Sequence, residues 1–270
     1  MDAVREALGT LEKVGSLPDQ AIDLAETALA LAALDYPEVD YARYRAHLAA
    51  IAQDVRRRES APADALREVL IGAYGYHGDR ESYDDLDNAN LIRVIDRRRG
   101  LPVALSILWL HAARAQGWQA DGLNFPGHFL IRVGAGGRAV LIDPFNDGAV
   151  LDDAALASLW RRVGGKSTEL TAEHCEPVSN RAILLRLQNN IKLRLLQAKR
   201  TEPALTVLER MVLTAPQEPA LWHECAGLHS SLGNLRAAQG CLERVIALAA
   251  SETARQAAAA ELKALRLRLN

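Results

Sequence analysis

Apolar residues recur at helical spacing through much of the first 75 residues. Residues 19–34 and 38–58 each place apolar side chains on one face, and Pro37 interrupts the pattern between them. A third helical pattern covers Asp64 to Tyr74. Residues 75–90 are polar and rich in turn-forming residues, which is typical of a loop. The pattern therefore predicts an almost entirely helical N-terminal part.

A strongly apolar segment follows this loop. Leu91 to Arg98 could form a short helix that Gly100 ends. Pro102 stands where the first residue of a helix commonly is a proline, and the segment after it is apolar almost all round until Gly117. A helix that is apolar on every face is buried in a core.

Two short segments rich in strand-forming residues come next, His128–Val133 and Arg138–Asp143. The run Gly134–Gly137 between them predicts a hairpin with a four-residue loop. With Val133 opposite Arg138, His128 would face Asp143 at the open end of the hairpin.

A helix over Asp152–Val163 and a polar, glycine-containing run up to Pro177 complete the first half. We interpret the polar run as a linker. The predicted domains are residues 1–175 and residues 176–270.

The second half contains an internal repeat. Leu208-Glu209-Arg210 recurs as Leu242-Glu243-Arg244, an offset of 34 residues that Ala204 and Ala238 share. This period is the length of a tetratricopeptide unit, two antiparallel helices that stack on their neighbours. Further features fit the same unit: Trp222 and Ala226 in a first helix, Pro216 at a unit end, and a last helix over Glu252–Leu267 that would cap the stack.

Composition narrows the class of protein. Of 270 residues, 49% are hydrophobic and 24% charged, as in ordinary globular proteins. A net charge of -2 argues mildly against a nucleic-acid partner. The only cysteines, Cys175, Cys225 and Cys241, are too widely spaced for a disulfide framework or a metal site. No signal peptide, membrane span or cofactor motif is recognisable, so we expect a cytoplasmic protein that binds neither membrane nor cofactor.

The expected His128–Asp143 pair is the main chemical feature. A carboxylate beside an imidazole orients it and raises its basicity, as in a nucleophilic triad. A helix starting near Pro102 could bring its N-terminus to this pair, and a thiol at such a position has a lowered pKa.

At this point the sequence resembles a family. RRRGLPVALSILWLHAARAQG, then NFPGHFLIR, then LIDPFNDG, is similar to the transglutaminase-like core of SirB-type proteins. The resemblance implies an α+β fold that is mostly helical, a papain-like core with a small antiparallel sheet, followed by a tetratricopeptide-type helical region. It also implies a regulatory role.

The resemblance identifies what the core lacks. Active transglutaminase-like enzymes have Gly-x-Cys at the start of the core helix, whereas this chain has Gly100-Leu101-Pro102. His128 and Asp143 match the histidine and aspartate of the pattern. Ser106, one turn after Pro102, is an alternative nucleophile, although a hydroxyl bonded within its helix is the simpler expectation.

Three interpretations of the pair stay open. It could lock the hairpin end, or it could remain as part of a non-covalent binding pocket. It could also bind a metal together with His77 or His111, although the spacing is that of no known ligand set. The residues of such a pocket would be Arg99, Gly100, Pro102, Gly127 and Asn146.

The run Arg97–Arg99 allows three interpretations. One of these arginines could pair with Asp143 or with an anionic ligand, or the run could simply be solvated at the surface, which is the simpler expectation. We expect a non-catalytic interaction or regulatory module whose repeats bind an unidentified protein or peptide. The alternative is a hydrolase or acyltransferase that uses His128 and Asp143 with Ser106 or a water.

Overall fold

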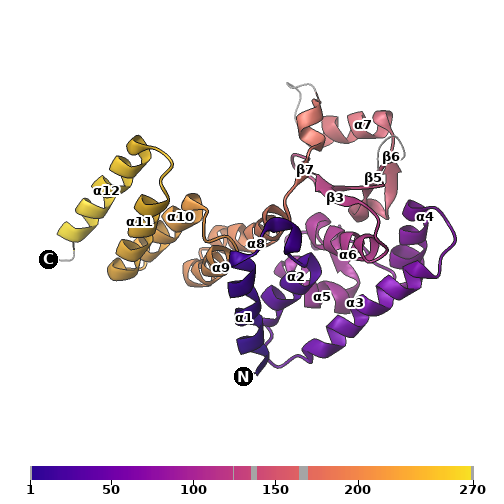
Figure 1. Cartoon of the computed structure of the whole chain (residues 1–270), viewed down its shortest axis with the longest axis horizontal. Coiled ribbons are helices and arrows are strands. Elements are labelled where there is room, and N and C mark those ends of the chain that lie inside the picture. The colour runs from indigo at the N-terminus through magenta and orange to yellow at the C-terminus, as the bar shows by residue number, and fades with distance from the viewer. Residues whose placement is uncertain (1, 124, 135–138, 164–169, 269–270) are drawn as a thin grey trace. The chain divides into compact units, whose positions relative to one another are not determined.

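The computed structural model describes residues 2–123, 125–134, 139–163 and 170–268. The chain divides into two compact units, one of Met1–Thr10 with Pro18–Leu187 and one of Leu11–Leu17 with Gln188–Asn270. Helices dominate both units, and strands occur only in the first among the described residues, which confirms the predicted fold class (Figure 1).

The first unit begins with helices. They are α1 (Asp2–Ser16, divided between the units), α2 (Leu24–Ala33), α3 (Tyr41–Arg56), α4 (Pro62–Arg67), the π-helical η2 (Glu68–Ala73), α5 (Leu91–Arg97) and α6 (Pro102–Arg114), with the 3-10 turns η1 (Asp19–Ala21) and η3 (Leu86–Ala89). Side chains of Asp23, Asp40 and Asn90 accept hydrogen bonds from the first turns of α2, α3 and α5. Eleven of the residues of α6 are buried, as its apolar pattern predicted.

The sheet of the first unit has the order β6-β5-β4-β3-β7, and all its pairs are antiparallel. Its strands are β3 (Ala120–Leu123), β4 (Leu130–Val133), β5 (Val140–Asp143), β6 (Ala149–Leu151) and β7 (Pro177–Val178). Helix α6 contacts β3 and β4, and α7 (Asp153–Val163) lies across the other face (Figure 1). Under α7 the core consists of Leu123, Phe125, Leu130, Leu156, Leu159 and Trp160.

Two local expectations were wrong. Val133 pairs with Val140, not Arg138, so the hairpin register differs by two residues. Residues 135–137 of the predicted hairpin loop and Arg138, predicted as the start of the second strand, lie outside the described residues. The predicted linker ends in β7, which pairs with β3, and Leu170 and Cys175 pack against the core under α7. Residues 164–169 of that linker also lie outside the described residues.

A second, short ladder joins two distant loops of the first unit. β1 (His77–Gly78) pairs in parallel with β2 (Arg99–Gly100). The segment after Gly75, predicted as plain loop, is therefore tied to the segment that leads into α6. A Cβ on Gly78 would meet the carbonyl oxygen of Phe145 at 2.5 Å, so the ladder also lies against the turn after β5.

The second unit is helical. The continuous helix α8 (Asn180–Gln197) enters it, and α9 (Thr201–Thr214), α10 (Pro219–Ser231), α11 (Leu235–Leu248) and α12 (Glu252–Leu267) follow. Both ends of α9 and α11 differ by 34 residues, the predicted period. The repeated positions Ala204, Leu208, Ala238 and Leu242 are at most 4% exposed. Small alanines and filling leucines at these positions give the close helix packing that the repeat predicts.

Candidate functional site

His128 and Asp143 meet in the first unit. Nε2 of His128 lies 2.9 Å from Oδ2 of Asp143, and both residues are buried. The expected cross-strand pairing is not the cause, since His128 precedes β4 and Asp143 is the last residue of β5. The chain turns at Gly127, whose φ of 68° favours glycine, and this turn carries the imidazole to the end of β5.

Asp143 has a second structural task. It is the N-cap of the 3-10 turn η5 (Pro144–Asn146), and its Oδ1 accepts hydrogen bonds from the amides of Phe145 at 3.1 Å and Asn146 at 3.2 Å. Nδ2 of Asn146 donates to Oδ2 at 2.5 Å. Burial raises the pKa of this carboxyl, but the bonds from His128 and Asn146 outweigh it and lower the pKa overall. Asp143 is therefore an ionised acceptor that holds the turn.

The orientation of the imidazole follows from this acceptor. Because a carboxylate only accepts, the Nε2–H of His128 donates. The ring meets Phe145 edge-on, with centroids 6.0 Å apart, and the His128 side chain is 10% exposed. Nδ1 has no hydrogen-bond partner among the described residues. The pair thus has the orientation of a general base, with little access to solvent.

The alternative nucleophile Ser106 is sealed. It is 0% exposed in the middle of α6, and its Oγ has no hydrogen-bond partner among the described atoms. The expectation of a hydroxyl bonded within its own helix was wrong in this respect. A substrate could reach this oxygen only if the packing around α6 opened.

The expected pocket residues do not all gather at the pair. Asn146 does, and its Oδ1 accepts from Nη2 of Arg80 at 2.7 Å. Gly127 precedes His128 in the turn, and Pro102 is the buried first residue of α6, a helix that contacts η5. Arg99 points elsewhere, since its Nη1 donates to Glu81 at 3.1 Å. Gly100 lies in β2.

Two arginines at this site were not predicted. Nη2 of Arg186 in α8 donates to the carbonyl oxygen of His128 at 2.6 Å and so stabilises the turn that contains His128. Arg80 lies with its guanidinium carbon 5.9 Å from the ring centroid of Phe145. Arg186 follows the boundary drawn at residue 175, and it is one of three arginines in α8, so its sequence position gives no signal of such a role.

The arginine run does not pair with Asp143. Arg97 forms ion pairs with Asp79, Asp85 and Asp87, and Arg99 pairs with Glu81. Asp79 is 1% exposed; burial raises its pKa, yet hydrogen bonds from Ser82 in particular lower it to about 2. Arg98 has no carboxylate partner among the described residues.

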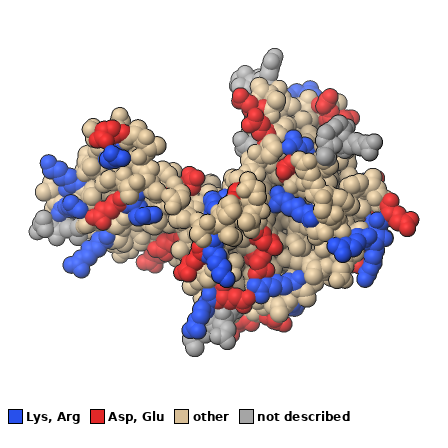
Figure 2. Space-filling view, in the orientation of Figure 1, with Lys and Arg blue, Asp and Glu red and all other residues tan. Residues whose placement is uncertain are grey.

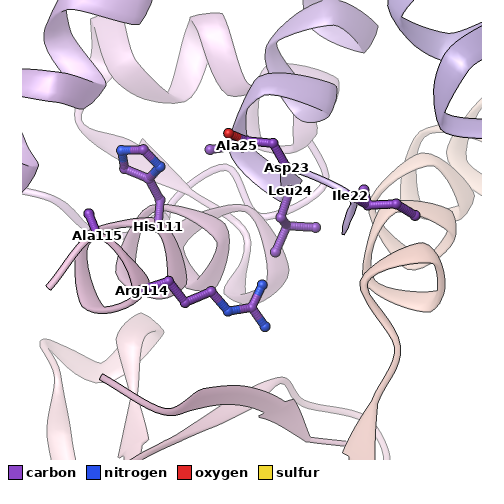
Figure 3. Close-up of a pocket in the computed structure, with 7 residues that line it drawn as sticks. All are labelled: Ile22, Asp23, Leu24, Ala25, His111, Arg114 and Ala115. Carbon is purple, nitrogen blue, oxygen red and sulfur yellow. The ribbon is translucent and has the colours of Figure 1, made fainter. Parts of the chain in front are cut away.

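The structure does not support the metal site that was considered for His128 and Asp143. The described residues contain no group of three histidine, cysteine, aspartate or glutamate side chains placed to hold a metal ion. Nδ1 of His77 lies 2.8 Å from the Gly75 carbonyl oxygen, and Nε2 of His111 lies 3.2 Å from that of Leu48. His111 and Arg114 instead project from α6 toward the start of α2, where they line a cavity of about 280 Å³ (Figure 3).

Comparison with known proteins agrees with this architecture. Residues 42–189 match the transglutaminase-like superfamily, and residues 191–268 match the tetratricopeptide repeat. A UPF0162 protein of Xylella fastidiosa (strain Temecula1) is 28% identical over 244 residues, 87% of each chain. A UPF0162 protein of Vibrio cholerae is 30% identical over 206 residues, 74% of this chain and 76% of that protein.

Another relative matches only part of the chain. Human F-box only protein 21 is 30% identical over 118 residues, 44% of this chain and 17% of that protein. The fold and site thus define a transglutaminase-like domain followed by tetratricopeptide repeats. The chain belongs to the UPF0162 family of transglutaminase-like proteins, which confirms the SirB-type resemblance. No helix in the described ranges has the length and apolar character needed to cross a membrane.

Proposed function

We propose that this protein is a non-catalytic interaction module, in which the transglutaminase-like unit is a folded platform and the helical repeats bind a segment of a partner protein. The observation that carries the proposal is Pro102. It occupies the first position of α6, where the family resemblance puts the nucleophilic cysteine. Proline has neither a thiol nor a hydroxyl, and all three cysteines come later in the chain.

The contacts of Asp143 support a bracing role for the surviving pair. Its carboxylate joins the end of β5, the η5 turn and the His128 turn through four hydrogen bonds. A buried carboxylate that is saturated in this way resists protonation and holds three chain segments together. This role gives the pair a structural task that requires no reaction.

The second unit offers a surface for a partner. Helices α10, α11 and α12 line an open cavity of about 240 Å³ that mixes small apolar with polar and charged side chains. Stacked helical pairs present such surfaces to peptide segments. The lining residues are His223, Ala226, Gly227, Ser230, Leu242, Glu261, Ala264, Leu265 and Arg268.

The charge distribution favours a protein partner over a nucleic acid. On the face drawn in Figure 2, Lys and Arg are interspersed with Asp and Glu. Together with the net charge of -2, this differs from the basic stripe that neutralises phosphates.

Two exposed helical glycines provide a matched test of the surface. Gly227 lines the cavity and Gly240 in α11 does not, and a Cβ on either would meet no atom within 4 Å. A photo-crosslinking amino acid at residue 227 should yield one discrete adduct in cells, whereas residue 240 should yield none. A synthetic peptide of the captured segment should then bind the purified full chain, and Gly227→Trp should abolish this binding while Gly240→Trp preserves it.

Equal capture from both positions, or peptide binding that Gly227→Trp leaves unchanged, would refute this surface as the partner site. A covalent adduct of a substrate analogue on the first unit would refute the non-catalytic part separately.

A further inference from the structure

Arg98 is a half-buried arginine in an unusual backbone position. It is the C-cap of α5, with φ 59° and ψ 21°, the left-handed conformation that glycine or asparagine normally adopts. Arg97 and Arg99, on either side of it, pair with acidic side chains, whereas Arg98 does not. An arginine is less favourable than glycine in this backbone conformation.

The guanidinium of Arg98 forms its hydrogen bonds through Nη1. Nη1 donates to Nε2 of His47 at 2.8 Å and to the hydroxyl of Tyr76, and these bonds use both of its hydrogens. The guanidinium carbon lies 4.8 Å from the Tyr76 ring centroid and 5.7 Å from that of Tyr74. These contacts fix the plane of the group.

The other edge of the guanidinium is free. Nε and Nη2 of Arg98 have no hydrogen-bond partner in the described part of the chain, and neither is among the buried unpaired atoms. This edge is the fork that pairs bidentately with a carboxylate or phosphate group.

His47 fixes the guanidinium from the Nη1 side, opposite the free edge. A guanidinium can only donate, so the Nε2 atom facing Arg98 must accept, and the proton of the neutral ring is on Nδ1. Burial, then Arg98 and Arg43, lower the pKa of His47 to about 4, so the ring stays neutral near pH 7. Nε2 also lies 2.7 Å from the Tyr76 hydroxyl, so His47, Tyr76 and Arg98 form one cluster.

These groups line one cavity of about 350 Å³ between α3 and α5, formed by Arg43, Tyr44, His47, Ile95, Asp96 and Arg98. Asp96 is its only carboxylate and is already engaged, since it accepts from Tyr44 at 2.9 Å and from Arg43 at 3.3 Å. Two guanidinium groups, one carboxylate and a neutral imidazole leave the lining with a net positive charge.

We propose that this cavity binds a small oxyanion, a phosphate or carboxylate group. Nε and Nη2 of Arg98 hold it bidentately, and Arg43 adds positive charge. The volume suits such a group with a small organic substituent. The site lies within the first unit, and its function does not depend on the repeats binding a partner.

The test follows the His47 ring resonances of the isotope-labelled full chain by NMR during titration with inorganic phosphate or malonate, at an ionic strength held constant with NaCl. A saturable shift with one of these anions, and none with added chloride alone, supports the site. The anion that saturates at lower concentration identifies the ligand class. Shifts that never saturate with either anion would overturn the proposal.

Three variants establish whether Arg98 is responsible. Arg98→Gln should weaken binding about tenfold or more, since it removes a charge-assisted bidentate pair. Asp96→Asn should strengthen binding severalfold, because it removes a negative charge and keeps an acceptor for Tyr44. Arg255→Gln on α12 is the matched control and should change nothing.

Unchanged affinity in both Arg98→Gln and Asp96→Asn would overturn the assignment. Should Arg98→Gln fail to fold, Asp96→Asn still decides, because tighter binding supports the site and equal or weaker binding contradicts it.

Discussion

Replacement of Asp143 by alanine tests the bracing role of the His128–Asp143 pair. The change removes the acceptor of four hydrogen bonds, from the His128 ring, the Asn146 amide side chain and the amides of Phe145 and Asn146. The bonds from the His128 ring and from the Phe145 amide are buried. Asp143→Asn keeps one acceptor oxygen but presents an amide N–H toward two donors.

The magnitude follows from the donors that are left unpaired. Each buried unsatisfied donor costs about 1–3 kcal/mol. Water can reach the half-buried Asn146, so the total loss for Asp143→Ala should be about 3–5 kcal/mol. At about 2–4 °C per kcal/mol for a unit of this size, the melting temperature should fall by about 6–20 °C. Asp143→Asn should lose less.

The assay must follow the first unit alone, because a chain of two units need not unfold in one step. Trp109, Trp118 and Trp160 all belong to the first unit and Trp222 to the second. Urea unfolding monitored by tryptophan fluorescence in a Trp222→Phe background therefore reports the first unit.

Asp153→Asn, at an exposed residue of the first turn of α7, is the matched control and should change stability by less than about 1 kcal/mol. A loss below about 1 kcal/mol for Asp143→Ala would refute the bracing role, since it would mean that the donors find other partners.

Three further predictions concern other parts of the chain. The pKa of Asp79 is about 2 in the folded state against 3.8 as the ordinary value, so its contribution to stability should be present above about pH 4 and be lost as the pH falls toward 2; Asp79→Asn should flatten acid denaturation curves in that window. Gly148→Ala should destabilise the first unit by more than about 2 kcal/mol, because its φ is 68° and the new Cβ would meet Trp109 at 2.2 Å; a variant with wild-type urea unfolding would show that α6 can give way. Glu224→Gln should lower the stability of the second unit by about 1–3 kcal/mol in Trp222 fluorescence, since it leaves the ammonium of Lys192, 5% exposed and 2.5 Å from Glu224, without a counter-charge; unchanged unfolding would mean that water solvates this lysine.

The helices were predictable because their signals are local. The last helix was predicted over Glu252–Leu267 and has these bounds, with the Ser251 side chain accepting from the amide of Ala254. The repeat was predictable since a fixed period of buried alanines and leucines leaves little freedom in packing. β3 gave no comparable signal, because Ala120–Leu123 has no β-branched or aromatic residue. Its place depends on close packing instead, since a Cβ on Gly122 would meet Phe129 at 2.7 Å and Ile183 at 2.8 Å.

The candidate site was predictable in its members but not in its geometry. The glycine run after Val133 signals a turn but not its length, so the register was wrong by two residues. His128 and Asp143 still meet, because the turn at Gly127 and the cap of η5 bring them together. For the run Arg97–Arg99, too, the residues were predictable but their contacts were not. Sequence could not tell which of Arg97, Arg98 and Arg99 lacks an acidic partner, since this depends on the left-handed turn at Arg98.

The central claim, that the transglutaminase-like unit performs no covalent chemistry, is tested most directly by intact-mass spectrometry of the purified full chain after incubation with a fluorophosphonate probe. We expect the mass of the unmodified protein, because Pro102 offers no nucleophile and the Ser106 hydroxyl is sealed within α6. A single adduct that is formed in the wild type and lost in Ser106→Ala would contradict the claim and favour the hydrolase or acyltransferase alternative.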